Sequence, residues 1–91
     1  MNSFNGPVIR IVKLAMSAVH ALGYAIHSVN ATCGLVTFYS PWKGIENIYS
    51  LNIEEISPNV FTITWGPFGQ HPRMDDSPPC NVIRGMVELG G

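Results

Sequence analysis

The hydrophobic period changes at Gly23, and this change limits the chain to folds that combine an early helix with a sheet. Over residues 5–23 apolar side chains recur every three or four positions, as they do along one face of an α-helix. Asn5 or Gly6 suits the cap of this helix, Pro7 suits its first position and Gly23 its end. Beyond Gly23 apolar and polar residues alternate, which is typical of strands with one buried face. The sequence therefore predicts an α+β fold.

Four strands and a closing helix are expected after Gly23. The strands cover residues 24–30, 35–40, 47–56 and 60–65, and "PWKG" (41–44) is expected to break the run between the second and the third. Short connections favour antiparallel pairing of neighbours in a meander. In the last segment, 77–91, Ser77 suits a helix cap and Pro78 the first helical position. We predict a single domain over residues 1–91, ordered α-β-β-β-β-α, with both helices on one face of a four-stranded antiparallel sheet and the other face largely wet.

The segment "AVHALGYAIHSVNATCGLVTF" (residues 18–38) combines a helix that ends at a Leu-Gly pair, an Ile-bearing strand, an Asn turn and a Gly that leads into a second strand. In this order of features it resembles the opening of small uncharacterised bacterial α+β domains. The resemblance covers about the first half of the chain and consists of structural residues only. It implies the fold and assigns no catalytic residue.

The chain carries little charge for its size, which indicates that part of its apolar surface meets a partner. Apolar residues make up 46% of the chain and charged residues 12%, which is about half the usual charged share. Excess apolar surface is often covered by a second copy of the same chain. The first helix is apolar around more than one face, because Ile9, Leu14 and Met16 lie off its main stripe. We therefore expect a homodimer, with these three residues at its interface.

Charge and hydropathy also exclude several classes of partner. Five basic against six acidic side chains give a net charge of -1, without the basic stripe that nucleic-acid binding or attraction to a membrane surface requires. The longest apolar stretch is broken by Arg10, Lys13 and His20, so it predicts neither a membrane span nor a signal peptide. The expected location is the cytoplasm, where Cys33 and Cys80 would stay reduced.

The stretch "GPFGQHPRMDDSPPC" (residues 66–80) is the alternative functional candidate. In the expected fold this long polar connection joins the last strand to the last helix. Together with Trp42, its residues Phe68, His71 and Arg73 are predicted to frame a small-molecule site. A structural explanation is also open, because polar residues suit a water-facing loop and the aspartates at 75 and 76 suit the start of a helix.

No motif in the sequence predicts a metal site, a cofactor or an enzymatic reaction. The soft and imidazole ligands show no close pairing of the kind that structural zinc sites use; they are His20, His27, Cys33, His71 and Cys80. Nucleophile-elbow and phosphate-binding glycine motifs are absent from the sequence. Of the two thiols, Cys80 is the better nucleophile candidate, because a helix N-terminus lowers a thiol's pKa. The function predicted is a non-enzymatic binding or assembly module that acts as a homodimer; the alternative is a small-molecule binding domain or small enzyme that uses the 66–80 loop.

Overall fold

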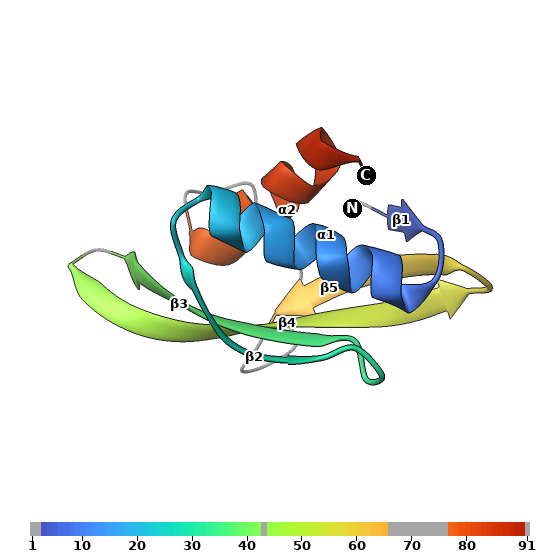
Figure 1. Cartoon of the computed structure of the whole chain (residues 1–91), viewed down its shortest axis with the longest axis horizontal. Helices are drawn as coiled ribbons and strands as arrows, with labels where there is room; N and C mark the ends of the chain where they lie inside the picture. Colours follow the sequence, from blue (N-terminus) through green and yellow to red (C-terminus); the bar gives the residue numbers. More distant parts are fainter. Residues whose placement is uncertain (1–2, 43, 66–76, 91) are drawn as a thin grey trace.

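The computed structural model describes residues 3–42, 44–65 and 77–90, together with their side chains except those of Trp42 and Ile45. Within these ranges the chain forms five strands and two helices (Figure 1). In chain order they are β1 (Ser3–Asn5), α1 (Val8–Ala21), β2 (Ala25–Asn30), β3 (Leu35–Trp42), β4 (Ile45–Ser57), β5 (Val60–Trp65) and α2 (Pro78–Leu89).

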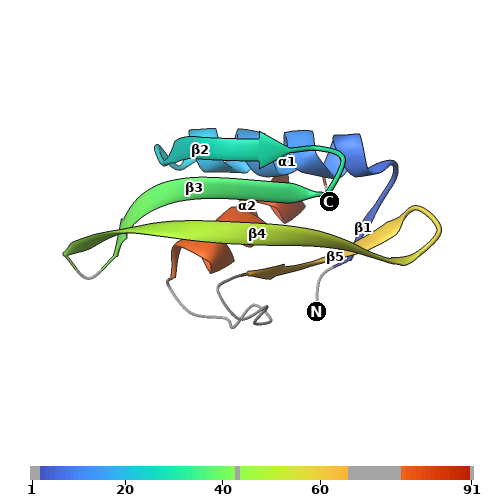
Figure 2. The same cartoon turned by 90° about the horizontal axis from the view of Figure 1, so that it is seen from below.

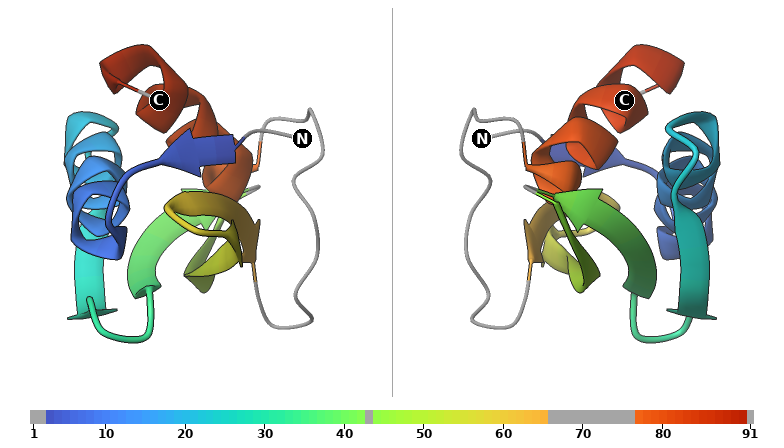
Figure 3. Two further views of the ribbon diagram at one scale, coloured as in Figure 1. Left: turned by 90° about the vertical axis from the view of Figure 1, so that its right-hand side faces the viewer. Right: turned by 90° about the vertical axis from the view of Figure 1, so that its left-hand side faces the viewer.

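The strands form one antiparallel sheet in the order β1-β5-β4-β3-β2, and both helices pack against the same face of it (Figures 1 and 3). The α+β fold and the β2-to-β5 meander are confirmed. The sheet has one strand more than the sequence predicted, since β1 pairs with β5 through Ser3 and Thr62. Three residues are too few to show an alternating pattern, and the partner of β1 lies more than fifty positions along the chain. The side chain of Phe4 closes this end of the core with 1% of its surface exposed.

The β3–β4 hairpin is longer than its sequence indicated. Pro41 was expected to break the run, yet it lies in β3 opposite Glu46 of β4. A proline is tolerated where one side of a strand has no partner. Pro41 meets this condition because it lies beyond Tyr39, the last β3 residue in register with β2.

The core lies between the sheet and the helices. Phe38, Leu51 and Ile63 of the central strands and Ile11 of α1 are each almost fully buried there. Burying a large apolar side chain contributes about 1.5–3 kcal/mol relative to leaving it in water, so this layer supplies most of the driving force for folding. On α2 the expected apolar side is right for Val82, Ile83 and Met86, which are buried, and wrong for Val87 and Leu89, which are exposed. Both residues lie in the last turn of α2, which rises away from the sheet (Figure 1).

The opposite face of the sheet is less wet than expected. Thr62 and Thr64 of β5 are each 4% exposed, and Thr37 of β3 is 7% exposed. The hydroxyls of Thr62 and Thr64 are buried, and in the described part of the chain they meet no hydrogen-bond partner. A buried hydroxyl without a partner destabilises a fold by roughly 1–3 kcal/mol. The expectation of a largely wet face is therefore wrong at these threonines.

Gly85 lies where α2 meets α1. A Cβ at this position would lie 3.2 Å from the Cβ of Ala18. Small residues at such a contact let two helix backbones approach closely. The glycine, which disfavours the helix by about 1 kcal/mol relative to alanine, is therefore explained by the close packing of the two helices.

Candidate functional site

Strand β2 forms an open edge of the sheet, and each of its six residues is exposed (Figure 2). Its sequence, AIHSVN, contains no charged residue and no proline. The unpaired backbone N–H and C=O groups of an edge strand can pair with another chain, and proteins usually prevent this with charged residues, proline or a β-bulge. On β2 the only feature of this kind is a register shift between Ile26 and Ser28. The side chains of this edge can therefore meet another surface without burying a charge.

Two apolar side chains of β2 lie on the helix side of the sheet. Ile26 is in register with Phe38, and Val29 is in register with Val36. Directly paired residues share a face, and both partners belong to the core. Ile26 and Val29 nevertheless remain 38% and 37% exposed, since the edge has no further strand beside it.

Helix α1 extends this apolar surface upward from the sheet. Arg10 donates from Nη2 to the carbonyl oxygen of Gly90 at 2.7 Å, so the Arg10 flank of α1 meets the end of α2. Successive helical residues are rotated by about 100°, which places Ile9 and Met16 on the opposite flank. Their exposed fractions are 44% and 37%. Figure 3 shows α1 above β2 at one edge of the sheet, with α2 beside α1 on the side away from that edge.

We name the four exposed side chains on this side of the molecule the edge patch: Ile9, Met16, Ile26 and Val29. Ile9 and Met16 are two of the three residues at which the sequence predicts an interface, and the structure shows that both are exposed. The third predicted residue, Leu14, lies elsewhere, because its half-buried side chain packs against the core. A Cβ at Gly90 would lie 3.9 Å from Leu14 Cδ1, which places Leu14 on the α2 flank.

Sequence reasoning did not select Ile26 and Val29. They are three positions apart, so strict alternation places them on opposite faces of a strand. The register shift between Ile26 and Ser28 brings them to the same face. The available signal was the absence of charge and proline from residues 25–30.

The alternative small-molecule site stays a prediction. Its loop residues, Phe68, His71 and Arg73, lie outside the described residues. Trp42 ends β3, but its side chain is also outside the described part of the chain.

The other candidate ligands lie in separate places. His20 is exposed in the last turn of α1, and His27 packs edge-on against Tyr39 with 5.1 Å between ring centroids. Cys33 is a free, exposed thiol in the β2–β3 turn, whereas Cys80 is free and only 2% exposed. Burial of Cys80 counts against a nucleophilic role, which requires access to a substrate. Among the described residues, no group of three His, Cys, Asp or Glu side chains could hold a metal ion.

A row of three aromatic rings supports the start of β2. Tyr24 stacks on Phe38, and Phe38 stacks on Tyr49, with 5.6 Å between ring centroids in each pair. Burial raises the pKa of the Tyr49 phenol above its ordinary value of 10.0; a hydrogen bond with the side chain of Asn47 acts in the opposite direction, and Tyr24 adds to the increase. Tyr49 is thus neutral at physiological pH, as expected of a packing residue.

Neither helix in the described part of the chain has the length and apolar character needed to cross a bilayer. Comparison with family models, curated proteins and solved structures gave no match for this chain.

Proposed function

We propose that this chain is a non-enzymatic assembly module that forms a homodimer through the edge patch and strand β2. The observation that carries the proposal is the open β2 edge without Asp, Glu, Lys or Arg, which exposes Ile26 and Val29 next to the exposed Ile9 and Met16 of α1. Burying these side chains in an interface stabilises a dimer by about 25 cal/mol for each Å² of apolar surface removed from water. A second copy of the chain presents the same surface, as a two-fold interface requires.

The arrangement of charge around the edge patch is compatible with self-association. Residues Ala25–Asn30 contain no Asp, Glu, Lys or Arg, and the flank of α1 above them carries Lys13 and His20 beside Met16. Long basic side chains can lie at the rim of an interface, with the charged group in water and the stem on apolar surface. Contact between two edge patches therefore requires no buried ion pair. The bulge in β2 interrupts a regular strand ladder, so packing of side chains is expected to contribute more than backbone pairing.

Sedimentation equilibrium at micromolar concentration tests the proposal. The wild-type protein is expected to be a dimer. Met16→Glu and Val29→Lys are each expected to weaken the dimer at least about tenfold, because each places two charges in an apolar contact. Leu14→Glu is a poorer test, because Leu14 packs against the core and its replacement would also disturb folding.

A matched control is available on the other helix. Val87 is 43% exposed, close to the exposure of Ile9, and lies on α2 away from the edge patch. Val87→Glu is expected to leave the dimer intact, and circular dichroism should show the same helix content for all variants. A monomeric wild-type protein, or a Val87→Glu variant that dissociates as readily as Met16→Glu, would contradict the proposed interface.

Cytoplasmic location belongs to the same proposal and is supported by two free thiols.

A further inference from the structure

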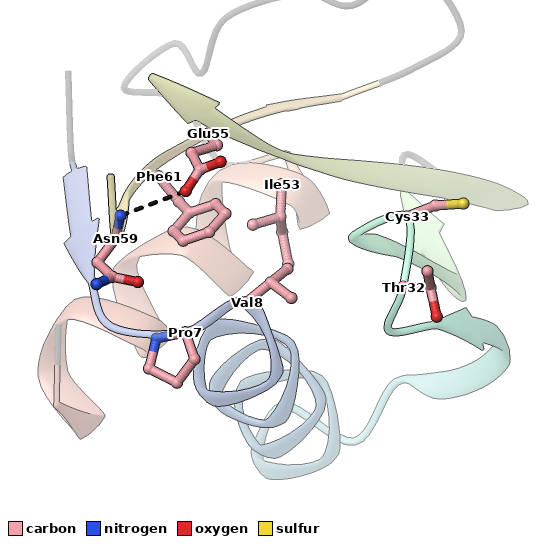
Figure 4. Close-up of a pocket in the computed structure, with 8 residues that line it drawn as sticks. All are labelled: Pro7, Val8, Thr32, Cys33, Ile53, Glu55, Asn59 and Phe61. Carbon is pink, nitrogen blue, oxygen red and sulfur yellow. Dashed lines mark hydrogen bonds between the residues drawn. The ribbon is translucent and has the colours of Figure 1, made fainter. Parts of the chain in front are cut away.

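A solvent-open hollow of about 460 Å³ lies at one end of the molecule, between the start of α1, the β2–β3 turn and the β4–β5 hairpin (Figure 4). Its volume is in the range of small-molecule sites. We name it the end cavity; its lining residues are Pro7, Val8, Thr32, Cys33, Ile53, Glu55, Asn59 and Phe61.

The walls of the end cavity are fixed by hydrogen bonds within the described chain. On one side, the side-chain oxygen of Asn30 accepts hydrogen bonds from the backbone N–H groups of Thr32 and Cys33, both at 3.1 Å. On the other side, the N–H of Gly6 donates to the carbonyl oxygen of Asn59 at 2.9 Å, which joins the entry to α1 to the β4–β5 turn. A site whose walls are held in place loses less conformational entropy when a ligand binds.

The floor of the cavity is partly apolar, and its rim carries one carboxylate. Val8, Ile53 and Phe61 supply the apolar surface. Glu55 lies above Phe61 in Figure 4, where its Oε2 accepts a hydrogen bond from the backbone N–H of Asn59 at 3.3 Å. Within the described part of the chain Glu55 has no ion pair, and none of the lining residues is a cation.

We propose that the end cavity binds a small aliphatic primary amine, with its ammonium group on Glu55 and its alkyl chain on the apolar floor. A carboxylate with a free oxygen pairs with an ammonium through a charge-assisted hydrogen bond. The positive end of the α1 dipole lies on the Pro7 side of the cavity. The ammonium group is therefore placed at Glu55, and the alkyl chain points toward Val8.

The Cys33 thiol takes no part in this contact. In Figure 4 its sulfur points away from Ile53 and Val8. Binding is thus expected to shift the backbone resonance of Cys33 without protecting its thiol from alkylation.

Titration of the ¹⁵N-labelled full chain with n-pentylamine, followed by NMR, tests the proposal. The expected result is weak, saturable binding in the millimolar range, with shifts concentrated at Thr32, Cys33, Glu55 and Asn59. n-Pentanol has the same alkyl chain without the charge, and pentanoate carries the opposite charge. Both are expected to bind at least about tenfold more weakly than the amine.

Two neighbouring glutamates supply a matched pair of variants. Glu55 is in register with Phe61 and faces the cavity, whereas Glu54 is in register with Thr62 and lies on the other face of the sheet. Glu55→Gln is expected to weaken amine binding about tenfold, and Glu54→Gln is expected to leave it unchanged. Equal losses in both variants, equal binding of pentanol, or shifts spread over the whole surface would each overturn the proposal. Shifts at the cavity only with a lysine-containing peptide, and none with the free amine, would overturn it in favour of a protein ligand.

Discussion

Replacement of Gly34 by alanine should destabilise the fold more than the same change at Gly23, because only Gly34 lies against another strand. Both glycines have positive φ, +69° at Gly34 and +78° at Gly23. In this left-handed region an alanine costs about 1–2 kcal/mol. Both variants therefore share the cost of placing an alanine in this backbone conformation. The difference between their losses in the free energy of unfolding measures the cost of packing the added methyl group at Gly34.

The packing term at Gly34 arises from the backbone of β4. A Cβ at Gly34 would lie 2.6 Å from the carbonyl oxygen of Ile53 and 3.2 Å from its Cβ. The strand cannot move away without cost, because the Ile53 N–H donates to the Gly34 carbonyl oxygen at 2.7 Å. Overpacking of this kind costs about 1–3 kcal/mol. At Gly23, in contrast, nothing lies within 4 Å of an added Cβ.

The expected losses in the free energy of unfolding are therefore about 1–2 kcal/mol for Gly23→Ala and about 2–5 kcal/mol for Gly34→Ala. Urea denaturation followed by tryptophan fluorescence measures both, with the slope m checked for a change in the unfolded state. Losses that agree within about 0.5 kcal/mol would refute the reasoning. They would mean that the close approach of the β2–β3 turn to Ile53 is absent or relaxes freely.

Two further predictions concern the sheet. Thr64→Val replaces a buried hydroxyl that has no partner in the described part of the chain by a methyl group of the same shape, so the free energy of unfolding should rise by about 1 kcal/mol; a loss of similar size in urea denaturation would show that the hydroxyl has a partner. Burial raises the pKa of Tyr49 in the folded chain. The contribution of this shift to the free energy of unfolding is therefore fully present below pH 10, and it is lost as pH rises through the pKa that Tyr49 has in the folded chain. Absorbance titration of tyrosinate, compared with a Tyr49→Phe variant, should therefore assign the late-titrating phenol to Tyr49, and early titration of this residue would contradict its burial.

The parts of the fold that follow from local pattern could be predicted from the sequence. The helix at Val8–Ala21 and the alternation of Phe61, Ile63 and Trp65 in β5 each depend on residues close together in the chain. The sequence could not show β1, since its partner is remote, nor the burial of Thr64, which depends on what covers that face of the sheet. The pairing of remote strands and the burial of one sheet face depend on how the whole chain packs, so they cannot be inferred from a local sequence pattern.

The candidate site shows the same limit. Ile9, Leu14 and Met16 were predicted as interface residues because they lie off the main stripe of one helix, and a stripe is a local property. Ile9 and Met16 are exposed, whereas Leu14 packs against the core. Ile26 and Val29 required knowledge of the bulge in β2 and of which strand is left at the edge. Glu55 required the register of β4 with β5, since the neighbouring Glu54 has the same chemistry on the opposite face.

The edge patch and the end cavity meet at the first turn of α1, yet they are separable. Val8 lines the cavity and Ile9 belongs to the edge patch, and neighbouring helical side chains point about 100° apart. Met16 lies two turns further along the helix, and Glu55 lies on the β4–β5 hairpin. A charge at Met16 is therefore expected to alter the proposed self-association without touching the cavity, and Glu55→Gln is expected to alter the cavity without touching β2. Because each surface can be changed alone, failure of one proposal leaves the other open to its own measurement.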